Sequence, residues 1–101
     1  MARKHLSTEI AECITKLKKL KELKPSRRLS NRLQNMYDAL HQAQGKEWEE
    51  QVAKYKEAKD ALDKAKKSAQ DAINDLAKTA EAIDKAANAF KAVLAALAFA
   101  L

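Results

Sequence analysis

From Trp48 to Leu101 the mainly apolar seam positions follow one heptad register, in which spacings of four and three residues alternate without a break. No Gly or Pro interrupts this stretch. Such a register is typical of coiled-coil and bundle helices. It predicts one helix over residues 46–101, on the order of 80 Å long at 1.5 Å per residue. Because one helix cannot bury its own apolar stripe, the pattern favours a protein that packs against partner helices. The register positions are Trp48, Val52, Tyr55, Lys59, Leu62, Lys66, Ala69, Ile73, Leu76, Ala80, Ile83, Ala87, Phe90, Leu94, Leu97 and Leu101.

The N-terminal part of the chain contains two shorter helical patterns. Apolar residues at helical spacing predict a helix over residues 7–24. A second apolar pattern, out of register with the first, predicts a helix over residues 26–43. Pro25 separates them and either ends the first helix or kinks one longer helix. The only glycine, Gly45, predicts a turn just before Trp48, where the long helix starts.

Together these patterns predict a single all-α domain. The expected architecture is an antiparallel helical hairpin with a long C-terminal helix and an N-terminal arm kinked or broken at Pro25, which assembles into a helical bundle. Ala, Leu, Lys and Glu are abundant and favour helices, whereas Val and Ile, which favour strands, are few. One alternative concerns the long helix, because Ser68 followed by Asp71 forms a capping pattern that can mark a break.

The predicted long helix changes character along its length. Lys59 and Lys66 occupy seam positions in its first half and are expected to loosen the packing there. The last ten residues, 92–101, contain no polar side chain. We expect this apolar tail to be buried in a homo-oligomer or against a helical protein partner; contact with a membrane is the alternative, although ten residues are too few to span one. The predicted interface residues are Ile73, Leu76, Ala80, Ile83, Ala87, Phe90, Leu94, Leu97 and Leu101.

The net charge of +6 is concentrated in the first third of the chain. Residues 1–33 contain ten Lys or Arg and three Glu, a net charge of +7, whereas residues 34–101 carry −1. The basic segment is either a solvated helix face or a contact for nucleic-acid phosphates, an acidic protein or lipids. Aromatic residues that stack on bases are missing from it, and the nearest is Tyr37. The candidate polyanion contacts are Lys18, Lys19, Arg27, Arg28 and Arg32.

The single cysteine, Cys13, excludes an internal disulfide. We expect a reduced, partly buried thiol, with an intermolecular disulfide as the alternative. The N-terminus lacks the apolar core of a secretory signal peptide, and no stretch of about 20 apolar residues is present. A cytoplasmic protein is therefore expected, with export by a route independent of a signal peptide as the alternative.

Recognisable catalytic and cofactor motifs are missing from the sequence. His5 and His41 have no Cys, Asp or His at the spacing of a metal site, and we expect both at the surface. Most carboxylates have a Lys or Arg one helical turn away, as in a solvated helix face. The sequence also lacks a glycine-rich phosphate loop and a nucleophile elbow. We therefore expect no enzymatic activity, no metal and no cofactor.

The turn and the second helix resemble WXG-type (ESX-like) small secreted helical-hairpin proteins. The resemblance covers about residues 30–93 and rests on the segment Gln44–Glu50, with its Trp48 at the start of the second helix, and on the run from Leu76 to Phe90. It implies a hairpin that dimerises into a four-helix bundle and serves as a secretion-linked partner of larger toxins. Three features depart from the family pattern: Glu50 stands where the motif has Gly, Phe90 replaces Tyr, and no acidic residue follows it.

The patterns favour a non-enzymatic interaction or assembly protein that oligomerises or docks with partner helices. The WXG-type resemblance adds a role as a secretion- or toxin-associated adaptor. Two alternatives remain: a nucleic-acid-associated protein that uses the basic N-terminal segment, and a membrane-active helical protein that uses the apolar C-terminal tail.

Overall fold

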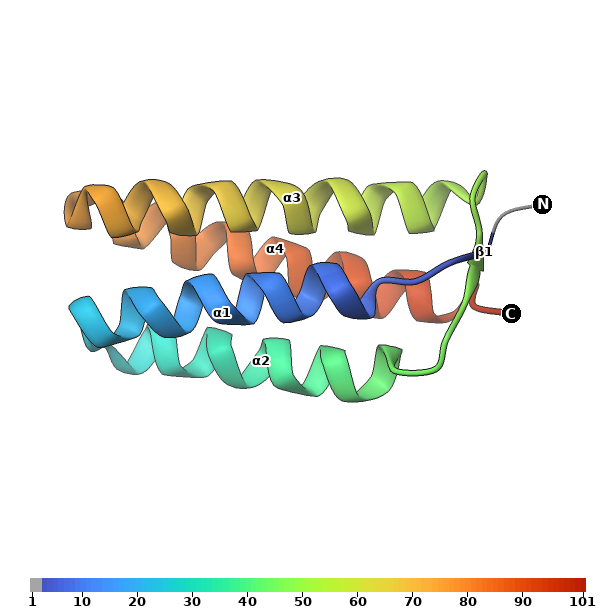
Figure 1. Cartoon of the computed structure of the whole chain (residues 1–101), viewed down its shortest axis with the longest axis horizontal. Helices are drawn as coiled ribbons and strands as arrows, with labels where there is room; N and C mark the ends of the chain where they lie inside the picture. Colours follow the sequence, from blue (N-terminus) through green and yellow to red (C-terminus); the bar gives the residue numbers. More distant parts are fainter. Residues whose placement is uncertain (1–2) are drawn as a thin grey trace.

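Over residues 3–101, which are the residues described by the computed structural model, the chain forms four α-helices and one short strand pair (Figure 1). The all-α prediction is therefore confirmed. The helices are α1 (Ser7–Leu23), α2 (Arg27–Ala43), α3 (Ala53–Asn74) and α4 (Thr79–Leu97). The strands are β1 (Arg3–Lys4) and β2 (Trp48–Glu49), and a 3-10 turn, η1 (Leu76–Lys78), precedes α4.

Pro25 breaks the N-terminal arm rather than kinking it. α1 ends two residues before this proline, and α2 begins two residues after it. Lys24 leaves the helical conformation, with φ −143° and ψ 82°, because the proline ring crowds a helical residue in front of it. The Ser26 hydroxyl then accepts a hydrogen bond from the backbone N–H of Leu29 at 3.4 Å. This bond caps the start of α2.

The prediction of one helix over residues 46–101 is wrong. α3 begins only at Ala53, η1 separates it from α4, and the longest dimension of the molecule is 42 Å. The break falls at Asp75, whose backbone is extended and whose carboxylate accepts a hydrogen bond from the N–H of Ala77 at 3.2 Å. Asp side chains compete for backbone hydrogen bonds in this way and favour helix ends. The alternative break at Ser68 is also wrong, because this residue is buried within α3.

The four helices form a bundle in which α1 and α3 run in one direction and α2 and α4 in the other (Figure 1). α1 packs against α2 and α3, and α4 packs against the same two helices, so α1 and α4 lie on one diagonal. The connection from α2 to α3 crosses the end of the bundle that carries β1 and the C-terminal residues. There β1 and β2 pair antiparallel, with Lys4 opposite Trp48. Gly45 adopts φ +77° just after α2, which confirms the predicted turn.

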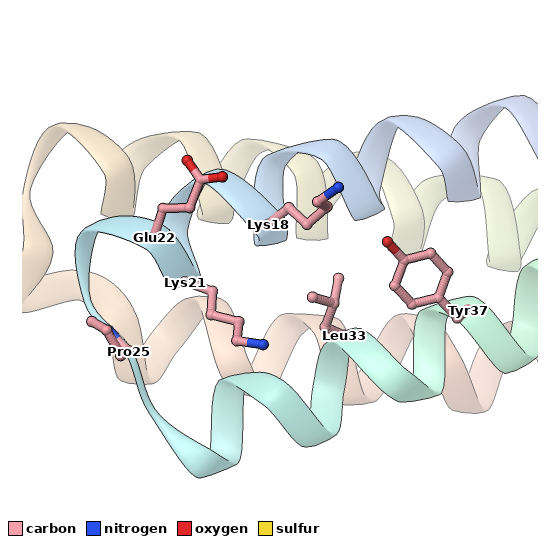
Figure 2. Close-up of a pocket in the computed structure, with 6 residues that line it drawn as sticks. All are labelled: Lys18, Lys21, Glu22, Pro25, Leu33 and Tyr37. Atoms are coloured by element: carbon pink, nitrogen blue, oxygen red, sulfur yellow. The ribbon is translucent and has the colours of Figure 1, made fainter.

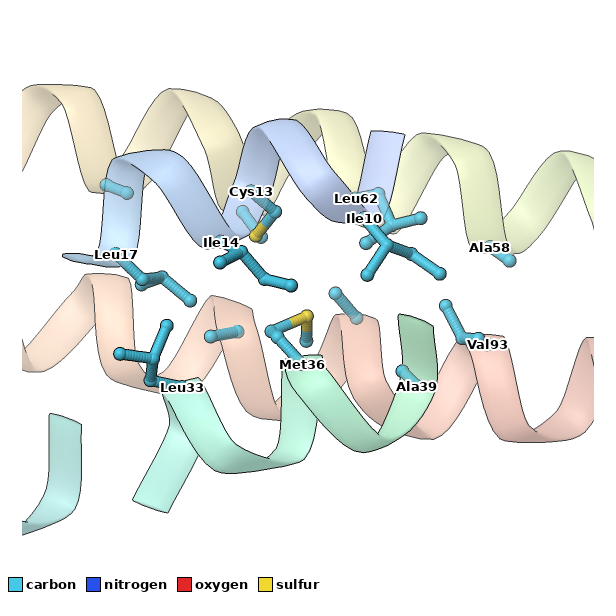
Figure 3. Close-up of a cluster of buried hydrophobic side chains, with 14 of the residues drawn as sticks. Ile10, Cys13, Ile14, Leu17, Leu33, Met36, Ala39, Ala58, Leu62 and Val93 are labelled. Atoms are coloured by element: carbon cyan, nitrogen blue, oxygen red, sulfur yellow. The ribbon is translucent and has the colours of Figure 1, made fainter. Parts of the chain in front are cut away.

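The core combines large side chains from α1 and α2 with small ones from α3 and α4. The buried residues of the first hairpin are Ile10, Cys13, Ile14, Leu17, Leu20, Leu29, Leu33, Met36, Ala39 and Ala43, several of which appear in Figure 3. The second hairpin buries Tyr55, Ala58, Leu62, Ala65, Ser68, Ala69, Ala72, Thr79, Ala82, Ile83, Ala86, Ala89, Val93 and Ala96. Alanine in so many facing positions allows the backbones of α3 and α4 to approach closely.

The buried stripes of the second hairpin depart in part from the predicted register, although Tyr55, Leu62 and Ala69 of α3 are buried as predicted. In α3, Ala58 and Ala65 are buried where the register predicted Lys59 and Lys66. Lys59 instead lies at the edge of the core and pairs with Asp63 at 3.2 Å. In α4, every buried position except Ile83 lies one residue before a predicted seam position. A lysine head group needs water or a partner, so the alanine beside it enters the core.

Candidate functional site

The predicted interface residues lie mostly outside the core. Ile83 is the exception, because it is only 6% exposed and belongs to the main hydrophobic cluster. We call the other eight residues the α4 apolar surface. Its half-buried members are Ile73, Ala87, Phe90 and Leu97, and its exposed members are Leu76, Ala80, Leu94 and Leu101. The structure thus leaves four of the nine predicted interface residues exposed.

On α4, the buried stripe contains Ile83 and Val93 but consists otherwise of small side chains, while Phe90, Leu94 and Leu97 are half-buried or exposed. The core stripe of this helix consists mainly of alanine, whereas Leu94 is 39% exposed and Leu76, in the preceding turn, is 37% exposed. Beyond the helix, Phe99 and Leu101 are 52% and 60% exposed. Exposed large apolar groups thus occur on α4 and next to both of its ends; such groups mark an interaction surface or a site of aggregation where they form a patch.

α4 has four charged residues, of which Glu81, Asp84 and Lys91 are exposed and Lys85 is half-buried. Asp84 forms an ion pair with Arg28 of α2 at 3.7 Å, in which the two side chains are 72% and 67% exposed. An ion pair this exposed adds little to stability. The Asp84 carboxylate therefore remains accessible to a further cation.

The candidate polyanion contacts divide into two groups. Lys18, Lys19 and Arg27 are exposed and form no ion pair with any residue between positions 3 and 101. Arg28 is engaged by Asp84. The Nε of Arg32 is buried and has no hydrogen-bond partner in the described part of the chain. Only the first group is therefore fully available to an external anion.

A groove of about 480 Å³ lies between α1 and α2, close to the turn that joins them (Figure 2). Its lining residues are Lys18, Lys21, Glu22, Pro25, Leu33 and Tyr37. Sequence analysis placed Lys18 and Lys21 in the basic segment and named Tyr37 as the nearest aromatic residue, but it did not predict that the three residues meet. The available signal was spacing: Lys18 and Lys21 are three residues apart, and Leu33 and Tyr37 four, so each pair shares one helix face. Only the α1–α2 packing brings the two faces together.

Trp48 belongs to the core and connects two parts of the fold. Its side chain is fully buried, and its Nε1 donates a hydrogen bond to the carbonyl of Ala96 at 2.8 Å. Its ring lies 6.2 Å from that of Tyr55, centroid to centroid. The neighbouring carbonyl of Glu47 accepts a hydrogen bond from the N–H of Leu101 at 2.8 Å. These contacts fasten the α2–α3 connection to the end of α4.

His5 and His41 are both exposed, as predicted. No group of three or more His, Cys, Asp or Glu suited to a metal ion occurs within residues 3–101. None of the described helices has the length and apolar character needed to cross a membrane.

The thiol of Cys13 is fully buried, whereas the sequence predicted a partly buried thiol. Burial raises the pKa of this thiol to about 12, and the nearby Lys66 opposes part of the rise. A thiol is reactive as the thiolate. We therefore expect Cys13 to resist thiol reagents in the folded protein.

The same pKa shift predicts that stability falls in alkaline solution. The thiol ionises near its ordinary pKa of 9.0 when the chain is unfolded but only near 12 when it is folded, so its contribution is complete below pH 9 and is lost as the pH rises towards 12. At about pH 10.5 the loss is about 2 kcal/mol. Urea unfolding of the wild type and of Cys13→Ala, below pH 9 and at about pH 10.5, measures this loss of stability. The variant has no thiol and should not show it. Parallel pH profiles for the two proteins would contradict the assignment.

Comparison of the chain with protein-family models, curated proteins and solved structures finds no match. The WXG-type resemblance remains a prediction.

Proposed function

We propose that this protein is a non-enzymatic interaction protein that self-associates through the α4 apolar surface. One observation carries the proposal: α4 contributes mainly alanine to its own bundle, while Leu76, Phe90 and Leu94 lie at or near the surface. Burial of a leucine or phenylalanine side chain contributes about 1.5–3 kcal/mol. A partner surface that covers these groups would recover this free energy.

A second copy of the chain suits this surface when the two α4 helices lie antiparallel. We consider a two-fold symmetric pair whose centre lies between Ala87 and Asn88. In such a pair, a residue of one α4 faces the residue of the other α4 that lies equally far along the sequence on the other side of the centre. This register sets Asp84 opposite Lys91, which have opposite charges, and places Leu94 level with Glu81 of the other copy. It also sets Ala80 opposite Ala95, where small side chains permit close approach. Both contacts occur twice, once in each direction.

The two apolar ends of the helix also support the antiparallel register. Leu76 and Phe99 are equidistant from the centre of the pair, and both are exposed in the single chain. Antiparallel pairing places Leu76 of one copy next to Phe99 of the other copy. A parallel pair would instead place Asp84 beside Asp84 and Lys91 beside Lys91, where like charges repel.

The Leu94→Asp substitution should convert the assembly into a folded monomer. The dissociation constant should rise at least tenfold, because a carboxylate would be buried without a partner. Sedimentation velocity across micromolar concentrations measures the change, and circular dichroism checks the fold. Leu23→Asp is the matched control, because Leu23 is 47% exposed on α1. A wild-type chain that stays monomeric at every concentration would overturn the proposal.

The orientation is tested by exchanging the two charges. Asp84→Lys and Lys91→Asp should each weaken the dimer, whereas the double variant should restore it, since each copy again presents opposite charges in the antiparallel register. Recovery in the double variant supports this register, and additive weakening contradicts it.

Two other occupants of the surface are distinguished by separate measurements. Flotation with lipid vesicles that depends on Leu94 and Phe99, in the absence of self-association, would favour the membrane alternative. A secretion- or toxin-associated role rests on the WXG-type resemblance alone. A toxin or secretion gene next to the gene for this chain would support that role.

A further inference from the structure

The α1–α2 groove combines an apolar base with positively charged walls. Leu33, at its base, is only 7% exposed, and Tyr37 beside it is 41% exposed. Lys18 and Lys21 of α1 both line the groove; the Lys21 side chain extends towards α2, and that of Lys18 runs along α1 (Figure 2). The groove therefore presents an aromatic ring and two cations to the same small volume.

The charge around the groove is nearly uniform in sign. Residues 16–34 contain eight Lys or Arg and one acidic residue, Glu22. Arg28 is paired with Asp84, and Lys16 donates a hydrogen bond to Gln70. The other six cations form no ion pair among residues 3–101. Their combined field attracts anions.

The fold removes the main objection to nucleic-acid binding that the sequence raised. Along the chain, Tyr37 is 16 residues from Lys21 and 19 from Lys18, so the basic segment lacks an aromatic residue of its own. In the bundle, all three side chains line one groove. Single-stranded nucleic acids are bound where a cationic groove follows the backbone and an exposed aromatic ring stacks on a base.

We propose that the α1–α2 groove binds single-stranded nucleic acid, with one base stacked on Tyr37 and the flanking phosphates on Lys18 and Lys21. The strand continues past Lys24 and Arg27, the exposed cations at the adjoining turn. A duplex binds less well, because its bases are stacked on one another and unavailable to the ring. An acidic peptide satisfies the lysines but offers no base to stack on Tyr37. The site is separate from the α4 apolar surface and does not depend on self-association.

The contribution of the phosphates is measured with a fluorescent oligodeoxythymidylate probe titrated at several salt concentrations. For a single strand, each phosphate contact adds about 0.7 to the slope of log affinity against log salt. The double variant Lys18→Gln/Lys21→Gln should reduce this slope by about 1.4 and weaken binding about tenfold at low salt. Lys56→Gln/Lys67→Gln is the matched control, because both lysines are exposed on α3. Equal losses in the two double variants would overturn the site.

The contribution of the base is measured with substitutions at Tyr37. Tyr37→Ala should weaken probe binding about tenfold, whereas Tyr37→Phe, which keeps the ring, should bind normally. Glu22→Gln should tighten binding, because it removes the one carboxylate at the rim. Circular dichroism shows whether each variant is folded.

Competition experiments decide between a nucleic-acid site and a general anion surface. Oligodeoxythymidylate should displace the probe more effectively than a polyglutamate of equal charge or a DNA duplex. Equal displacement by polyglutamate, together with normal binding by Tyr37→Ala, would overturn the proposal in favour of an acidic protein partner. No binding of the probe at low salt would also overturn it.

Discussion

Replacing Trp48 by alanine should lower the free energy of unfolding by about 3–5 kcal/mol. The side chain is fully buried, packs near the Tyr55 ring and donates a hydrogen bond from its Nε1 to the carbonyl of Ala96. Since small domains are stable by only about 5–15 kcal/mol, this loss is a large part of the total. Urea unfolding followed by far-ultraviolet circular dichroism measures it, because the variant has no tryptophan to serve as a fluorescent probe.

The Trp48→Phe variant separates apolar burial from hydrogen bonding. Phenylalanine keeps most of the buried ring but cannot donate a hydrogen bond to the carbonyl of Ala96. That carbonyl still accepts a hydrogen bond from the backbone N–H of Phe99 at 2.9 Å. We expect a loss of about 1 kcal/mol, the typical net value of one hydrogen bond. A Trp48→Ala loss below about 1 kcal/mol would contradict the anchoring role of the tryptophan.

The Ile83→Asp substitution should unfold the chain rather than dissociate an assembly. Ile83 is 6% exposed within the core, so the variant buries a carboxylate without a cation. The cost of such a change exceeds about 4 kcal/mol. It should diminish as the pH falls below about 4, because the carboxyl becomes neutral in the unfolded chain as well. Thermal unfolding monitored by circular dichroism at two pH values measures both effects.

A conservative substitution and a surface substitution serve as controls for this result. Ile83→Val removes one methylene and should lower stability by about 0.5–1.5 kcal/mol without changing the pH dependence. Leu94→Asp places the same charge one residue beyond the buried position Val93 and should leave the chain folded. A folded Ile83→Asp monomer would contradict the assignment of Ile83 to the core.

The two proposed surfaces involve different parts of the bundle. The groove lies between α1 and α2, and α4 lies diagonally across from α1. Self-association through α4 therefore leaves the groove accessible. A dimer would present two such grooves, and a single strand that bridges them would bind more tightly than either groove alone.

Residues with strong local preferences were interpreted correctly from the sequence. The sequence located the disruption at Pro25, as a kink or a break, and the turn at Gly45, which accommodates a positive φ angle; the structure has a break at Pro25 and the turn at Gly45. The break at Asp75 was missed, because the heptad register continues through it in sequence although the backbone does not. The side-chain hydrogen bond to Ala77 that supports this break depends on only two residues and leaves the apolar spacing unchanged.

The register error in the second hairpin has a different cause. Sequence analysis followed the unbroken heptad spacing, which placed Phe90 and Leu94 on the seam. The bundle instead buries Ala89 and Val93, one residue earlier in each case. Leu17, Leu20 and other large side chains of the first hairpin already fill much of the core. Small residues on α4 then permit the closest packing, and the larger ones lie at the edge.

Helical composition, the two turns and the basic first third follow from the sequence by itself, because each depends on local backbone preference or on charge. The division of α4 into a buried stripe and an α4 apolar surface was decided by tertiary packing, since a helix that is apolar over most of its circumference specifies no single buried face. The meeting of Tyr37 with Lys18 and Lys21 was likewise decided by tertiary structure. These residues lie on different helices, and only the antiparallel packing of α1 and α2 makes them neighbours.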